Sequence, residues 1–442
     1  MASTAKYWIL AAVALAPTLA ISTKVHAQEA AGAPITTGVT ATNAVDSDSY
    51  DRGLNIGVMD RSRPDYQAIG IQAGGFTIFP KVTMTGTYDD NVFAVPNGTG
   101  DFIFDVAPEI AIQSNWSRNS LSAYARLDQD AYARFSSQDT TQYDAGIAGK
   151  LQFGDASYMN GGLDYGHFAL PRSISNNFGA SSNPISYDYT ALNDEVVGQF
   201  TRIRLSLRVD DQDFKYQNGE TNGGALVFLG NESHNDVILT GKAEYAVSPD
   251  TAVYVDVQGN HRGYDLAPPV VPFTLTSNGY EVNAGANFDL THLIRGEFEL
   301  GYLTQTYVSP LFKPVQGLAG KAEIEWFPTQ LTTVTFVASR QIGASQVVNS
   351  AGFIGSSVSA RVDHELLRNL ILSGNVSAGY DENIGIDRND TLVGAGLSAK
   401  WLITRHIGVT FAYVYADQKS VGTAAGPTFV DNRGTVSLVL QL

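Results

Sequence analysis

The sequence contains no cysteine, which excludes a disulfide framework and thiolate-bound metals. Charged residues make up only 16% of the chain, against about 25% in ordinary soluble domains. The net charge of -16 lacks the basic excess that binding to nucleic acid requires. After the N-terminus, no apolar run is long enough for a helical membrane span. What remains is rich in 43 glycines, 21 tyrosines and 21 phenylalanines, a composition that favours strands, turns and interfacial rings.

The N-terminus has the pattern of a secretory signal peptide. Lys6 precedes a short apolar core that contains Pro17, and Val25-x-Ala27 ends the pattern with small residues. Ala20 offers a second cleavage position, and a membrane anchor is the alternative interpretation, although the core is short for a span. We therefore expect residues 1–27 to be a signal peptide. Residues 28–70 show no sustained period, which predicts a flexible periplasmic segment.

The rest of the chain alternates between apolar and polar residues with a period of two. In the stretch RIRLSLRVD, for example, the side chains from Ile203 to Val209 on one face are apolar and the other face carries charges. The segments with this pattern predict about eighteen strands: 74–88, 101–115, 119–134, 141–153, 156–168, 188–200, 202–216, 235–247, 251–263, 278–290, 295–307, 315–327, 331–341, 353–364, 369–380, 391–401, 406–417 and 430–442.

Short and long connections alternate between these strands, which separates a membrane barrel from a soluble sandwich. Outer-membrane barrels have short periplasmic turns and longer outer loops. In lipid every backbone N–H and C=O group must be paired, so the sheet must close on itself. We expect an all-β fold: a closed antiparallel transmembrane barrel of about eighteen strands, with 16–18 as the range, formed by residues 71–442. A barrel of this size has a lumen that side chains alone do not fill.

The stretch RSRPDYQAIGIQAGGFTIFPKVTMTGTYDDNVF, residues 61–93, resembles the start of the beta-barrel porin 2 family of Gram-negative bacteria. The shared features are Arg61-x-Arg63-Pro64, Ile69-Gly70-Ile71, Gly75-Phe76 with Pro80, and the turn Tyr88-Asp89-Asp90-Asn91. The resemblance implies an outer-membrane barrel that is often associated with exopolysaccharide synthesis and export. It implies no catalytic residues and no cofactor.

Charged side chains on the faces opposite the apolar ones are the candidates for a functional lumen. They can form a structural lattice of ion pairs, a channel that selects solutes by size and field, or both. The candidates are Arg126, Asp128, Asp130, Arg204, Arg208, Asp210, Lys242, Glu244, Asp256, Lys321, Glu323, Glu325, Arg361 and Asp363. A sugar-binding aromatic track would need lumen-facing rings, and Tyr124 and Tyr254 are the two that the pattern indicates.

Other polar clusters have simpler interpretations. The Asp89-Asp90-Asn91 run could bind Ca²⁺, but a strand-to-loop turn at the outer rim is favoured because a calcium loop needs more ligands at fixed offsets. The same applies to the acids of residues 381–390. His167, His234 and His261 lie near predicted outer rims, yet no metal or hydrolase motif surrounds them, so we expect no catalytic, metal or cofactor site.

Arginines recur in the short turns, where lipid head groups or the periplasmic rim could hold the charge. They are Arg118, Arg202, Arg295, Arg368 and Arg405.

Taken together, these features predict an outer-membrane porin that passes polar solutes. Its expected partners are outer-membrane lipid, lipopolysaccharide and a polar solute or polysaccharide, with no nucleic acid. A non-conducting structural or adhesion barrel is the alternative, and an enzyme with a rim site is a third. The pattern does not distinguish monomer from trimer.

Overall fold

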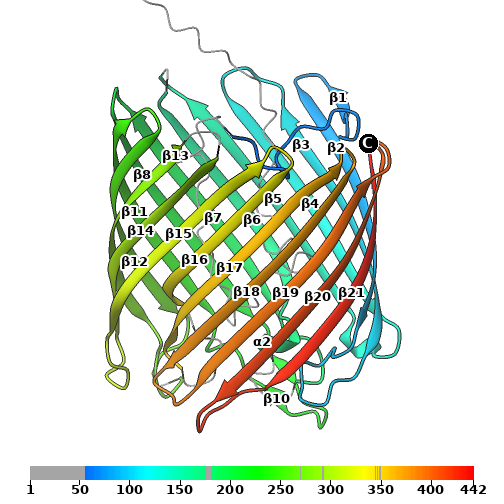
Figure 1. Cartoon of the computed structure of the whole chain (residues 1–442). Helices are drawn as coiled ribbons and strands as arrows, with labels where there is room; N and C mark the ends of the chain where they lie inside the picture. Colours follow the sequence, from blue (N-terminus) through cyan, green and yellow to red (C-terminus); the bar gives the residue numbers. More distant parts are fainter. Residues whose placement is uncertain are drawn as a thin grey trace, which may run out of the picture.

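The chain forms one closed antiparallel β-barrel, shown in Figure 1. The computed structural model describes residues 55–442, apart from 155, 176–180, 269, 291–292, 344, 346 and 348–349. The predicted signal peptide, residues 1–27, and the first part of the predicted flexible segment, residues 28–54, lie outside the described residues. Each barrel strand pairs with its neighbours in sequence, and β2 pairs with β21 to close the sheet.

Eighteen strands make up the wall, as the alternation predicts. They are β2 (Phe76–Asp89), β3 (Asp101–Ser114), β4 (Ser120–Tyr132), β5 (Thr140–Gln152), β6 (Tyr158–Ala169), β7 (Ser186–Gln199), β8 (Ile203–Tyr216), β11 (His234–Ser248), β12 (Thr251–Tyr264), β13 (Ser277–Leu290), β14 (Ile294–Tyr307), β15 (Val315–Thr329), β16 (Thr332–Gly343), β17 (Gly352–Leu367), β18 (Leu370–Ile384), β19 (Asn389–Leu402), β20 (Ile407–Val421) and β21 (Phe429–Gln441).

Among the residues that the structure describes, five short elements lie outside the wall. They are β1 (Ile71–Ala73), which pairs with the start of β2, and, in the long connections, η2 (Ser136–Gln138), α2 (Arg172–Ser175), β9 (Gly219–Glu220) and β10 (Leu226–Val227). The short turns, the C-terminus and β1 lie at the upper end in Figure 1, whereas α2 and β10 lie at the lower end. The short-turn end is the periplasmic one, because outer-membrane barrels have short turns there.

The strand boundaries differ from the prediction mainly at the outer ends. Strands β18 and β20 were expected to end at residues 380 and 417, but they continue to Ile384 and Val421. The added residues include Asp381 and Glu382, which the sequence pattern assigned to an outer loop. Asp381 instead pairs across the sheet with Asp390, so the connection between β18 and β19 is only residues 385–388.

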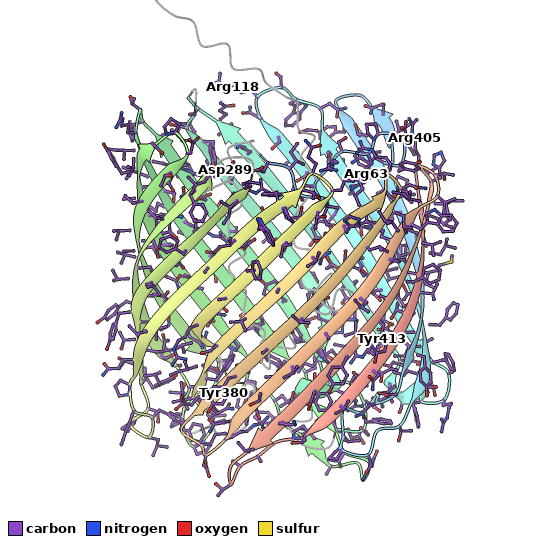
Figure 2. The ribbon with its side chains drawn as sticks, viewed as in Figure 1. Arg63, Arg118, Asp289, Tyr380, Arg405 and Tyr413 are labelled. Atoms are coloured by element: carbon purple, nitrogen blue, oxygen red, sulfur yellow. The ribbon has the colours of Figure 1, made fainter. Side chains whose placement is uncertain are left out.

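Alternation places apolar side chains on the outside of the barrel and polar ones on the inside. Leu300 and Leu318 are 72% and 73% exposed. Exposing leucine side chains to this degree is unfavourable in water and favourable in lipid. Tyr380 and Tyr413 also point outward and lie toward the outer end in Figure 2, as expected for an interfacial aromatic girdle. Within the described part of the chain, no helix has the length and apolar character needed to cross a membrane.

Candidate functional site: the inner wall of the barrel

All fourteen predicted lumen residues lie on the inner face. The sheet register shows this, because facing residues share one side of the sheet: Arg126 faces Glu109 and Asp144, Lys242 faces Asp256, and Arg361 faces Thr335. The exposed apolar side chains occupy the alternate positions on the same strands. The register gives the position of these residues in the sheet, and their role as lumen-lining residues stays a prediction.

Three of these arginines bind the aspartate two positions further along the same strand. Arg208 holds both oxygens of Asp210 at 2.8–3.0 Å, and Arg361 holds both oxygens of Asp363 at 2.8 and 2.9 Å. Arg126 binds Asp128 at 2.6 Å. A strand places residues i and i+2 on one face, so each pair lies flat along the wall. These pairs support the structural-lattice interpretation for this part of the candidate set.

Other candidates contact polar groups on nearby strands. Asp130 accepts a hydrogen bond from Thr140 at 2.9 Å, and Glu244 accepts one from Asn287 at 2.7 Å. Arg204 donates to the hydroxyl of Tyr158 at 3.0 Å.

Strands β11 to β15 form a sector in which acids exceed bases, and we call it the acidic sector. Lys242 lies 3.5 Å from Glu297 and over the ring of Tyr254, whose hydroxyl donates to Glu299 at 3.1 Å. The inward acids of the sector are Asp236, Glu244, Asp256, Glu281, Asp289, Glu297, Glu299, Glu323 and Glu325, and its inward bases are Lys242, Arg262, Arg295 and Lys321. A wall with this composition carries a negative field into the lumen.

Tyr124 and Tyr254 lie against the wall. Each faces a glycine across the sheet, Gly146 and Gly285 respectively. A Cβ atom at either glycine would stand within 2.5 Å of a tyrosine ring atom, so the absence of a side chain lets the ring lie along the strand. Tyr254 is only 3% exposed. Neither ring therefore stands out into the lumen as a free stacking surface.

A larger set of inward aromatic rings lies at the outer end, and the sequence interpretation missed it. Tyr187, Phe214 and Tyr216 are buried together with Leu170, Ile185 and Leu229, which belong to the connections 170–185 and 217–233. His234 stacks between Phe214 and Tyr264, with ring centroids 4.9 Å apart on each side. In β8 the even-numbered residues, such as Arg204 and Arg208, face inward. Phe214 and Tyr216 are also even-numbered, so extending this alternation to the end of the strand would have predicted that they face inward.

These rings anchor the described parts of the two longest connections, residues 170–175, 181–185 and 217–233, on the inner side of the barrel. Arg172 in α2 donates to Gln138 of η2 at 2.7 Å and to the carbonyls of Ser181 and Ser182 at 2.8 and 3.0 Å. A second apolar cluster joins Leu275 and Ala351, which lie in neighbouring connections, to Tyr307 at the end of β14 and Val315 at the start of β15. The outer end is therefore narrowed by chain that packs inward, which the sequence pattern did not predict.

Glu232 lies at the end of the connection 217–233. The carboxyl group is buried, and its recorded hydrogen bond comes from Asn231 at 2.6 Å. Burial raises the pKa of Glu232 from its ordinary value to about 7, so this carboxyl changes charge near neutral pH.

The periplasmic end is narrowed differently, by residues 55–68, which we call the N-terminal strap. Its contacts follow the inner rim from β13 to β20. Asn55 donates to Asp289 at 2.9 Å, and the backbone of Val58 donates to Thr333 at 2.9 Å. Arg405 donates to the carbonyl of Pro64 at 3.0 Å. Figure 2 shows Asp289, Arg63 and Arg405 at this end.

Glu365 is the centre of the strap's attachment. Arg61 and Arg63 of the strap bind one of its oxygens at 3.0 and 2.8 Å, and Arg368 approaches the other at 3.5 Å. Arg368 also donates to the carbonyl of Ser62, and Arg295 donates to that of Asn55. Three of the five arginines predicted in the short turns, Arg295, Arg368 and Arg405, thus hold the strap. Residues 55–70 belong to the segment expected to be flexible, yet they make defined contacts; the predicted division at 27 and 70 stays a prediction.

The rim histidines do not form a catalytic constellation among the described residues. His167 binds Asp188 at 2.8 Å and stacks on Tyr143. Neither of these two contacts is with a serine or threonine that could serve as a nucleophile. His261 binds Asn278 at 2.8 Å, and His234 binds the carbonyl of Glu232 at 2.6 Å. Each ring therefore has a structural partner.

The acids of residues 381–390 lie partly in strands and partly in the connection between β18 and β19. Asp390 is held by Arg388 at 2.8 Å and Asp387 accepts from the backbone of Thr423 at 2.9 Å, so they do not converge on one point.

The chain was compared with known families, curated proteins and solved structures. The family model described as Putative beta-barrel porin 2 matches residues 63–442. None of the curated protein sequences matches the chain. Among solved structures, Acinetobacter baumannii OccAB3 is similar with a TM-score of 0.45 and 11% identity, covering 84% of this chain and 100% of that one. Pseudomonas aeruginosa OccK2 (OpdF) in complex with glucuronate gives 0.46 and 10%, covering 83% and 98%.

The family match spans most of the chain, including all eighteen barrel strands. An apolar exterior, a closed sheet and a polar interior are the features that a barrel in an outer membrane requires. The protein therefore belongs to the beta-barrel porin 2 family of outer-membrane β-barrels.

Proposed function

We propose that the protein is an outer-membrane channel for polar solutes, with a preference for cations over anions. The acidic sector carries this proposal, because its carboxylates exceed its bases on a wall that faces the lumen. Side chains do not fill the interior of an eighteen-strand barrel, so a water-filled path is the expected consequence of the strand count. Fixed negative charge beside such a path concentrates cations and repels anions.

Reconstitution tests the proposal. Purified, folded protein in liposomes is expected to admit small neutral sugars in a swelling assay. In planar bilayers under a potassium chloride gradient, the reversal potential is expected to take the sign for potassium preference. A triple variant, Asp256→Asn with Glu281→Gln and Glu299→Gln, is expected to reduce that preference. Chloride preference in the wild type would contradict the assignment of the acidic sector.

A non-conducting structural barrel is the second candidate, and the inward packing at both ends favours it. Absence of both swelling and conductance from well-folded protein would support that candidate and reject the channel. The exopolysaccharide link rests on the family resemblance alone. Unchanged polysaccharide secretion in a deletion strain would reject it.

A rim enzyme is the remaining alternative, and the pairing of His167 with Asp188 gives it no nucleophile among the described residues. A panel of ester and peptide substrates would test it.

A further inference from the structure

The outer end of the barrel seam brings together carboxylates that are far apart in sequence. Asp89 ends β2, Asp90 follows it, and Asp431 lies near the start of β21. One oxygen from each of these three residues lies within 4.8 Å of the others. The first two belong to the turn singled out in the sequence, and the third comes from the last strand of the barrel.

Hydrogen bonds within the turn satisfy the polar groups of Asn91, but they do not satisfy every carboxylate oxygen of the three acids. Asn91 donates to the carbonyls of Val95 and Val430 at 2.8 Å, and its backbone donates to Asp89 at 2.7 Å. Asp90 accepts from the backbone and the side chain of Asn432, both at 2.8 Å. The favoured turn is therefore present, and it joins the first strand to the last.

Asp431 is the group that this network leaves incomplete. It is 2% exposed, and its Oδ1 atom has no hydrogen-bond partner among the described residues. A buried carboxylate oxygen without a partner is costly unless a cation or a donor reaches it.

Arg433 is the one base recorded in contact with these carboxylates in the described part of the chain. It lies 2.7 Å from Asp431 and 3.2 Å from Asp89. One guanidinium beside three carboxylates leaves an excess of negative charge in a largely buried position.

We propose that Asp89, Asp90 and Asp431 bind a calcium ion that fastens the seam between β2 and β21 at the outer end. Calcium takes oxygen ligands at about 2.3–2.6 Å, so two of its ligands are at most about 5 Å apart, and the three oxygens of this cluster lie within that limit, 4.8 Å, of one another. Water molecules would complete the coordination. The site is independent of conduction, because it lies on the wall and acts on closure of the barrel.

The test uses the full-length folded protein in detergent without lipopolysaccharide, with calcium chloride or a chelator. Calcium is expected to raise the midpoint of thermal unfolding, read as the loss of the fast-migrating folded band on a gel, by about 2–4 °C. Terbium is expected to bind with luminescence sensitised by the nearby Tyr88 and Tyr413. Asp431→Asn is expected to abolish both effects, whereas Asp387→Asn, in the exposed neighbouring loop, should leave both unchanged.

If Asp431→Asn does not fold, Asp90→Asn provides the second variant, since among the described residues the Asp90 side chain accepts hydrogen bonds only from Asn432. An identical calcium shift in wild type and in the variant that folds would overturn the proposal. The proposal would also be overturned if calcium did not change the stability of the wild type and Asp431→Asn were more stable than the wild type in chelator. That result would mean that Arg433 alone compensates the charge of the cluster.

Discussion

The two ends of this barrel are narrowed by different physical means. At the outer end, the connections 170–185 and 217–233 pack apolar side chains such as Leu229 onto inward aromatic rings. At the periplasmic end, the N-terminal strap is held by guanidiniums that converge on Glu365 and on backbone carbonyls. Apolar packing is non-directional and insensitive to salt, whereas ion pairs depend on charge and salt. The ends should therefore respond to different perturbations.

The largest effect is expected from Glu365→Ala. The change leaves Arg61, Arg63 and Arg368 without their shared carboxylate, and losing one partner of a buried pair costs about 3–5 kcal/mol. The strap should detach, and trypsin should then cleave after Arg61. N-terminal sequencing of the digested barrel measures this. Glu382→Ala, at an exposed acid of β18, is the matched control, and equal protection in both variants would show that Glu365 does not hold the strap.

Leu229→Ala should detach the connection 217–233 from the inner wall at the outer end. Leu229 is buried in the aromatic cluster, and truncation of such a leucine costs about 2–5 kcal/mol. Chymotrypsin should cut the connection 217–233 faster, and single-channel conductance should rise if the connection narrows the path. Leu226→Ala in the same connection removes an exposed side chain and should change neither measurement. Equal effects from both leucines would argue against a packed anchor.

The pH should modulate the outer end through Glu232. Its pKa in the folded protein, about 7, lies above the ordinary value of 4.5, so the folded state favours the protonated form. The docked connection is thus most stable below about pH 4.5 and loses up to about 3 kcal/mol as the pH rises to about 7. The ratio of chymotrypsin cleavage rates for wild type and Glu232→Gln, each measured at the same pH, should rise over this window. A constant ratio would show that protonation of Glu232 does not stabilise the docked connection.

Salt should give the smallest effect and should act at one end only. Raising ionic strength from about 0.1 to 1 M shortens the screening length from about 10 to 3 Å, which should weaken the partly exposed pair Arg61–Glu365 by less than about 1 kcal/mol. Trypsin cleavage after Arg61 should increase slightly, and chymotrypsin cleavage at residues 217–233 should not. Equal sensitivity of both ends would contradict the distinction between ionic and apolar attachment.

The sequence predicted the wall better than what lies inside it. Alternation fixes which face of a strand is apolar, so the strands and the inward positions of residues such as Arg208 and Lys242 followed from the period of two. Loop packing depends on contacts between distant segments, and no local pattern links Leu170 to Tyr216. Likewise, Arg61 and Glu365 are 304 positions apart, and Asp431 joins Asp89 only because the barrel closes.

The central claim is that a polar path crosses this barrel between its two narrowed ends. Single-channel recording in a planar bilayer, on protein shown to be folded, tests it most directly. The account predicts discrete conductance steps with potassium preferred over chloride, larger in Leu229→Ala than in wild type. Absence of any steps from folded wild type and from Leu229→Ala alike would contradict the claim.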